Sequence, residues 1–265
     1  LPFAHPGETA APFDPENVVT VRLHDLIEAW TNPSKLYCQR TLGLRLDRLE
    51  SEGLADAEPL AVEGLELYSL QQGMLNQLLR RKEEGRSGFE LSSARGALPP
   101  GKLAQAWHER LAQTPREVAD SCGNLAFLDP EEIEIRIEGR LITGRIDNLT
   151  SSGCLQARCA SIKAKDMIRG WITYLAANAS HLRPKDGCLP YRIVGAKDEA
   201  MEFKELAPER ARQLLVSLIA GYGRALRGPQ PFFAETSLHI YQGDVSRTNR
   251  AWHGDDRNKI PGEKD

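Results

Sequence analysis

Charged and apolar residues alternate strictly in the middle of the chain, where Ile133, Ile135 and Ile137 are separated by single charged residues. This period of two places the isoleucines on one face of a strand and the charges on the other. Gly139 follows and allows a tight reversal into a second strand. The pattern predicts three consecutive strands, over residues 131–138, 140–149 and 153–159.

Apolar residues recur every three or four positions on either side of these strands, which is the period of a helix with one buried face. We predict helices over residues 21–30, 33–43, 59–81, 101–111, 163–179 and 208–226, another helix opening at the capping-box sequence 114–117, and a fourth strand over 189–195. Proline-rich residues 1–20 predict an extended lead-in to a domain over residues 21–241. Residues 242–265 are polar, so we expect a disordered tail.

The predicted elements follow the order helix, three strands, helix, strand. This is the order of the restriction-endonuclease-like core, also called the PD-(D/E)xK nuclease core. We therefore expect an α/β fold of this class with additional helices.

Four further motifs lie in order along the chain, at residues 21–44 (VRLHDLIEAWTNPSKLYCQRTLGL), 162–176 (IKAKDMIRGWITYLA), 231–237 (PFFAETS) and 250–256 (RAWHGDD). Together they resemble the C-terminal nuclease-like domain of RecC, the gamma subunit of exodeoxyribonuclease V. The resemblance covers most of the chain from residue 21 to residue 256. It implies a domain of the RecBCD helicase–nuclease, which processes double-strand DNA ends in repair and recombination, with a helicase-like region upstream.

The nuclease chemistry is replaced at most of the matching positions. The resemblance to the related, active RecB nuclease domain implies a His on the first core helix, an Asp ending the second strand, Asp-x-Lys on the third, and a Gln four residues before a Tyr on the next helix. There, two carboxylates hold Mg²⁺ and the lysine serves the attacking water. The matching positions here are Tyr68, Asp147, Gln156, Arg158 and Gly170. An amide offers a cation no charge and a guanidinium stays protonated, so Gln156 and Arg158 cannot replace the acid and the lysine.

The resemblance therefore implies a non-catalytic domain with no metal or other cofactor. It implies an architectural and DNA-handling role, in which the domain contacts RecB and RecD and helps to split duplex DNA at double-strand ends. Two alternatives remain open. One is an active Mg²⁺-dependent DNA nuclease that uses Asp147 with an acid from elsewhere, such as Glu134 or Glu66. The other is an unrelated protein-binding module.

Two clusters are candidates for contact with DNA or a partner. The cations Arg80, Arg81, Lys82 and Arg86 are predicted to touch phosphate, although cations at the end of a helix also compensate its dipole. Phe232 and Phe233 form an apolar, proline-flanked segment that is predicted either to bind a partner subunit or to pack on its own domain.

Charge and cysteine content limit the other possibilities. A net charge of -3 at pH 7 argues against a protein that coats nucleic acid with its whole surface. The chain has no apolar run of about 18 residues, so we expect no membrane contact. Its five cysteines are scattered without the spacing of a zinc site. We predict reduced, mostly buried thiols and a cytoplasmic location.

Overall fold

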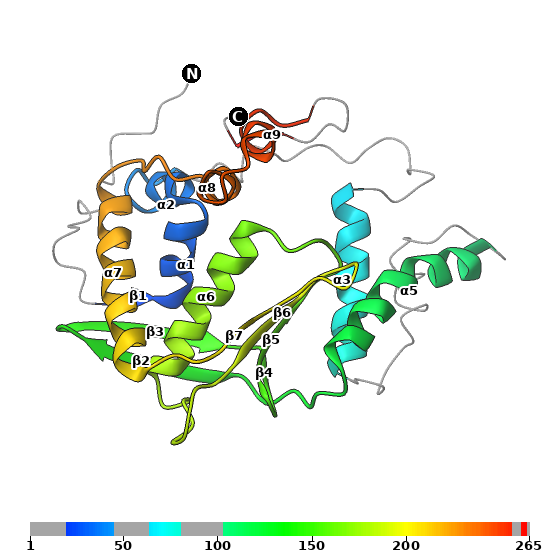
Figure 1. Cartoon of the computed structure of the whole chain (residues 1–265), viewed down its shortest axis with the longest axis horizontal. Helices are drawn as coiled ribbons and strands as arrows, with labels where there is room; N and C mark the ends of the chain where they lie inside the picture. The colour runs from blue at the N-terminus through cyan, green and yellow to red at the C-terminus, as the bar shows by residue number, and fades with distance from the viewer. Residues whose placement is uncertain (1–19, 45–63, 81–102, 256–260, 264–265) are drawn as a thin grey trace.

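The computed structural model describes residues 20–44, 64–80, 103–255 and 261–263. Within these ranges the chain has a mixed α/β fold with eight helices and two small sheets (Figure 1). The predicted α/β class is confirmed at this level. The lead-in expected over residues 1–20 lies, apart from Thr20, outside the described residues.

The first sheet has the strand order β1-β3-β2 and the second β4-β5-β6-β7. The strands are β1 (Thr20–Arg22), β2 (Glu131–Ile137), β3 (Arg140–Ile146), β4 (Leu149–Thr150), β5 (Gly153–Ala157), β6 (Tyr191–Val194) and β7 (Ala200–Phe203). β2 and β3 form the predicted antiparallel hairpin. Glu138 and Gly139 both have positive φ, 48° and 75°, as a two-residue turn of the type that matches strand twist requires.

The three-strand meander expected of a nuclease core is divided between the two sheets. β3 pairs with β2 and, in parallel, with β1, whereas β5 pairs with β4 and, in parallel, with β6. The prediction of a helix from residue 21 was wrong at its start, because Thr20–Arg22 form β1. Residues 18–21 are all β-branched, which favours a strand, and Val21 is buried beside Ile142.

The helices are α1 (Leu23–Thr31), α2 (Pro33–Arg40), α3 (Gly64–Arg80), α5 (Leu103–Cys122), α6 (Ala164–Ala179), α7 (Pro208–Arg227), α8 (Ala234–Tyr241) and α9 (Val245–His253). The largest apolar core joins α1, α6 and α7 to both sheets. A smaller core joins α3 and α5 to β5 and β6. Figure 1 accordingly shows α1 and α7 at one end of the molecule, α3 and α5 at the other, and α6 between them.

One helix, α5, replaces the two helices predicted over residues 101–111 and from residue 114. Pro115 lies inside it. A proline leaves the carbonyl four residues earlier without its helical donor. Here Gln71 Nε2 of α3 donates to that carbonyl, Leu111 O, over 3.2 Å. This side-chain contact, together with the burial of Leu111 and Val118, explains why the helix continues.

The disordered tail expected from residue 242 was also wrong, because Val245–His253 form α9. The Asp244 side chain accepts a hydrogen bond from Arg247 N at 2.9 Å and so caps the helix. The Trp252 ring packs edge-on against Phe233, with ring centroids 4.9 Å apart. A capping residue and an aromatic contact thus help to hold a polar helix, which composition alone does not reveal.

Candidate functional site

Four of the five matching nuclease positions line one cavity of about 1030 Å³: Tyr68, Asp147, Gln156 and Arg158. The walls come from α1, α3, β3, β5 and α6. Gly170 is not among the lining residues. It lies where α6 packs on β6, and a Cβ there would stand 2.7 Å from Ile193 Cδ1. At residue 170 the glycine therefore serves close packing of helix on sheet.

Asp147 follows the end of β3 and is the one acid among the five positions that the resemblance singled out. Its side chain is 62% exposed, and Oδ1 pairs with Arg145 Nε at 2.6 Å. Its backbone oxygen accepts from Arg80 Nη2 at 3.3 Å. Asp147 thus lies between two guanidinium groups, which oppose the approach of a divalent cation.

Gln156 belongs to a chain of neutral groups. The Tyr191 hydroxyl donates to Gln156 Oε1 at 3.0 Å and accepts from Asn148 Nδ2 at 3.1 Å. Burial raises the pKa of Tyr191 well above its ordinary value, so its hydroxyl stays protonated at physiological pH. The position that the resemblance matches to a second carboxylate is therefore part of an uncharged hydrogen-bond network.

Arg158 is held by an internal ion pair. Its Nη1 bonds Asp166 Oδ2, and the two side chains are only 14% and 10% exposed. The guanidinium carbon lies 5.7 Å from the centre of the Tyr68 ring. Asp166 also accepts from Lys163 N at 2.9 Å, at the start of α6. Arg158 therefore carries a fixed positive charge where a nuclease lysine would serve the water.

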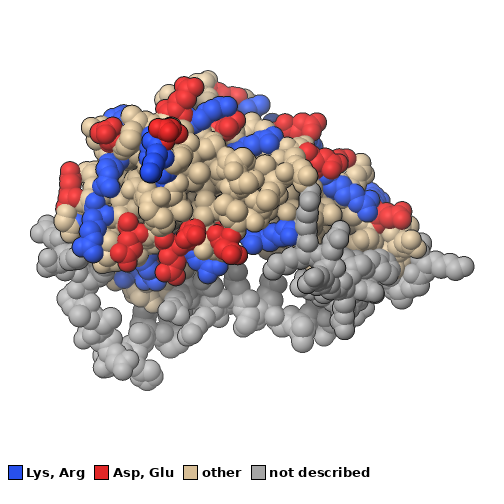
Figure 2. All heavy atoms as spheres, turned by 90° about the horizontal axis from the view of Figure 1, so that it is seen from below, with Lys and Arg blue, Asp and Glu red and all other residues tan. Residues whose placement is uncertain are grey.

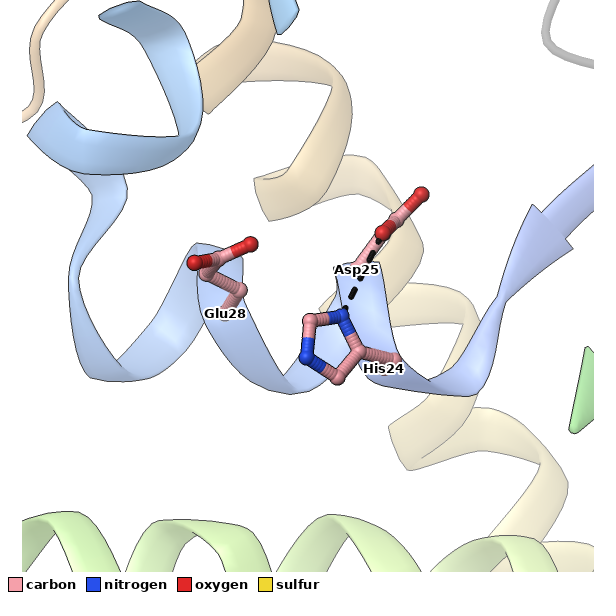
Figure 3. Close-up of side chains that lie close together, drawn as sticks. All are labelled: His24, Asp25 and Glu28. Carbon is pink, nitrogen blue, oxygen red and sulfur yellow. Dashed lines mark ion pairs between the residues drawn. The ribbon is translucent and has the colours of Figure 1, made fainter. Parts of the chain in front are cut away.

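The described residues offer one group with metal-ligand spacing, His24, Asp25 and Glu28 of α1, whose ligand atoms lie within 4.8 Å of one another (Figure 3). His24 and Glu28 line the cavity. However, Asp25 is buried and accepts from Arg40 Nη2 at 2.7 Å and from Arg22 Nε at 3.0 Å. Two guanidinium groups already neutralise this carboxylate, so the residues present do not fit a divalent cation.

The acids suggested for an active nuclease do not reach the cavity. Glu134 and Glu66 are both exposed, and neither is among the lining residues. The acids that do line the cavity are Glu28, Asp147 and Asp166, against the cations Arg22, Lys35, Arg80, Arg145, Arg158 and Arg169. Three carboxylates among six cations give the cavity a positive balance, which suits an anion better than a metal ion.

Sequence patterns missed three of the residues that decide the site. Tyr191 belongs to an apolar strand, and no local pattern distinguishes its hydroxyl from that of a core tyrosine. Asp166 stands three residues after Lys163 in the capping position of α6, and this spacing was a usable signal. Asp25 stands three residues after Arg22, but its partner Arg40 comes from the next helix.

The candidate contact residues are only partly within the described residues. Arg80 lines the cavity, and its guanidinium carbon lies 5.5 Å from the centre of the Phe127 ring. Arg81, Lys82 and Arg86 lie outside the described residues. Phe232 and Phe233 are half-buried and line a second cavity beside α8. No helix among the described residues is long and apolar enough to cross a membrane.

Comparison with known proteins relates the chain to one family. The family model described as the RecC C-terminal domain matches residues 19–244. The RecBCD enzyme subunit RecC of Escherichia coli is 29% identical over 79% of this chain and 18% of its own length. The subunit of the same name from Mycolicibacterium smegmatis is 25% identical over 88% of this chain and 21% of its own length. The chain thus spans about a fifth of the length of these relatives.

Proposed function

The chain belongs to the RecC C-terminal domain family, and from this premise we propose that it is a non-catalytic, DNA-handling and scaffolding domain of a RecBCD-type helicase–nuclease. In this proposal the domain has a degenerate restriction-endonuclease-like core. It contacts the RecB and RecD subunits and assists in splitting duplex DNA at double-strand ends. The name of the relatives, RecBCD enzyme subunit RecC, supports the assembly.

One observation carries the non-catalytic part of the proposal. Three of the four matching positions that line the cavity have a polar partner inside the protein: Asp147 has Arg145, Gln156 has Tyr191, and Arg158 has Asp166. The fourth, Tyr68, lies with its ring against the Arg158 guanidinium. Two-carboxylate coordination of Mg²⁺ needs charge at positions 147 and 156, and only the first provides it.

The order of elements supports the nuclease-like core. β5 and β6 are parallel neighbours connected through α6, which is the strand–helix–strand unit that ends the expected pattern. The retained Asp147 follows β3, and Gln156 and Arg158 come from β5 and its end. An ancestral active site would occupy the same cavity.

The DNA-handling part rests on the charge of that cavity. On the face seen from below in Figure 2, Lys and Arg side chains are interspersed with Asp and Glu. We place the phosphate contacts in the cavity because its cations outnumber its acids, with Arg80 and Arg169 as contributors.

Incubation of the protein with single- and double-stranded DNA in Mg²⁺ or Mn²⁺ tests the proposal. We expect no cleavage. Cleavage that is lost in Asp147→Ala but kept in Glu134→Ala, a control at an exposed acid outside the cavity, would show that an active nuclease site is present. Cleavage that both variants retain would identify a contaminating nuclease and would leave the expected result standing.

A further inference from the structure

A second cavity, of about 1000 Å³, lies beside α8. We call it the α8 groove. Its apolar lining is Leu44, Phe232, Phe233, Ala234 and Ala251, and its cations are Lys35, Lys163, Lys165, Arg247 and Arg250. Leu44 is 49% exposed, which leaves an apolar surface open to a ligand. The groove thus combines an apolar surface with an excess of positive charge.

The two acids of the groove are both bound to backbone amides. Glu235 Oε1 accepts from Ala164 N at 2.7 Å, at the start of α6. Glu263 accepts from Glu235 N at 3.1 Å and from Thr236 N at 2.9 Å, at the start of α8. Of the five cations, Arg247 pairs with Asp244 at 3.4 Å and Lys35 with Glu28 at 3.9 Å. Lys163, Lys165 and Arg250 remain to attract further negative charge to the groove.

The chain itself places an acidic peptide segment in this groove. Pro261, Gly262 and Glu263 are among its lining residues. The segment is held through its main chain as well as its carboxylate, because Glu263 N donates to Ala251 O at 2.9 Å. A carboxylate at the amino end of α8 is stabilised by the free amides and by the helix dipole.

The first turn of α8 has a further unused polar group. Thr236 is 8% exposed, and its Oγ1 has no hydrogen-bond partner within the described part of the chain. A buried hydroxyl without a partner is costly. This group lies on the residue whose amide already binds Glu263.

We propose that the α8 groove is a docking site for an acidic segment of a partner protein that also carries apolar side chains, and that residues 261–263 are an internal occupant which competes with it. The inference rests on the proposed scaffolding role, because it gives the scaffold a defined contact. Phe232 and Phe233 supply the apolar part of the surface. The cations and the amides of α8 supply the acid-binding part.

The observed occupant favours a peptide over a nucleic acid. A main-chain amide of the occupant donates to a carbonyl of α9, and a phosphodiester backbone has no such donor. The carboxylate bonds two successive amides at the start of α8. The partner therefore presents acid side chains from a backbone that can pair in this way.

Titration of the whole protein with a fluorescent peptide of alternating glutamate and leucine tests the proposal. The matched peptide of alternating lysine and leucine is the control ligand. We expect the acidic peptide to bind and the basic peptide not to bind. Glu263→Gln weakens the internal occupant, so the acidic peptide should bind about tenfold more tightly, as for the loss of one charge-assisted contact. Arg250→Glu should weaken its binding by about tenfold.

Arg210→Glu on α7 makes the same charge reversal away from the groove and should leave the peptide affinity unchanged. The two groove variants act in opposite directions, so partial unfolding cannot produce both results. An acidic peptide that fails to bind, or whose affinity is the same in all variants, would overturn the proposal. Binding of oligothymidylate that responds to Glu263→Gln and Arg250→Glu, without peptide binding, would also overturn it. None of these results bears on DNA cleavage, so the groove can fail while the non-catalytic assignment stands.

Discussion

The ion pair between Arg158 and Asp166 holds a positive charge at the position that the resemblance matches to a nuclease lysine. Asp166→Asn removes the negative charge but keeps an oxygen that can accept from Lys163 N, so the cap of α6 survives. The substitution therefore isolates the ion pair. Arg158 is left with an uncompensated charge at a site that is 14% exposed.

The expected cost follows from this burial. Removing one partner of a buried ion pair costs about 3–5 kcal/mol. The remaining exposure of both side chains lets water reach the charge, so we expect a loss of about 2–4 kcal/mol in the free energy of unfolding. Such a loss is a large part of the total stability of a typical domain, which is about 5–15 kcal/mol.

Urea unfolding followed by tryptophan fluorescence measures this loss. Asp186→Asn, at an exposed loop position, is the matched control and should change stability by less than about 0.5 kcal/mol. The double variant Arg158→Met with Asp166→Asn removes both charges and should be more stable than Asp166→Asn alone. A cost for Asp166→Asn no larger than that of the control, or strictly additive effects in the double variant, would refute the assignment of Arg158 to a buried ion pair.

Three further predictions concern metal, DNA and thiols. The double variant Gln156→Glu with Arg158→Lys should bind Mn²⁺ at millimolar concentration, as measured by electron paramagnetic resonance, and the parent should not. The variant gains a carboxylate beside Asp147. An absence of binding would mean that the side chains at 147, 156 and 158 do not converge. DNA binding by the parent should be weak and salt-sensitive. In a plot of the logarithm of the binding constant against the logarithm of salt concentration, Arg80→Gln and Arg169→Gln should each reduce the slope by about 1, whereas Arg210→Gln should not. Sub-micromolar binding at physiological salt would contradict a small number of phosphate contacts in the cavity. Burial raises the pKa of Cys122 and Cys159 to about 11 and that of Cys154 to about 12. At pH 8 iodoacetamide should therefore modify Cys38 and Cys188 but not these three. The buried thiols should react only near pH 11 or when the protein unfolds. Detection of modified Cys154 by mass spectrometry, in native protein labelled at pH 8, would contradict this prediction. Burial alone would raise the pKa of Cys188, but hydrogen bonds from Leu206, Tyr174 and Glu205 lower it overall, so Cys188 should react faster as the pH rises toward 8.

Local patterns were sufficient for the elements whose structure is decided locally. The hairpin of β2 and β3 follows from its alternation and from Gly139. The start of α2 follows from Asn32, whose side chain accepts from Lys35 N at 3.0 Å, and from Pro33 as the first helical residue. The prediction of free, mostly buried thiols is confirmed for Cys122, Cys154 and Cys159, while Cys38 and Cys188 are half-buried.

Contacts between distant residues decided what the sequence did not show. The helix of α5 continues through Pro115 because Gln71, from another helix, supplies the missing donor. β1 combines a local run of β-branched residues with pairing to β3, which the sequence did not place beside it. Helix α9 packs on Phe233, which lies eleven residues before Asp244 and outside any local helical pattern.

The same limit applies to the candidate site. The resemblance singled out Gln156 and Arg158, and both line the same cavity as Asp147. Their partners could not be predicted, since Tyr191 and Asp166 are brought to the cavity by β6 and α6. The positive balance of the cavity likewise arises from cations on several elements.

Calorimetric titration of the protein with Mn²⁺ tests the central claim most directly, because metal binding must precede any nuclease chemistry in this cavity. We expect no saturable binding up to millimolar Mn²⁺, and a trace for Asp147→Ala that is indistinguishable from that of the parent. The reasons are the amide of Gln156 in place of an acid, the internal ion pair of Arg158, and the guanidinium groups beside Asp147. Stoichiometric binding by the parent that disappears in Asp147→Ala would contradict the claim that the site has lost its metal.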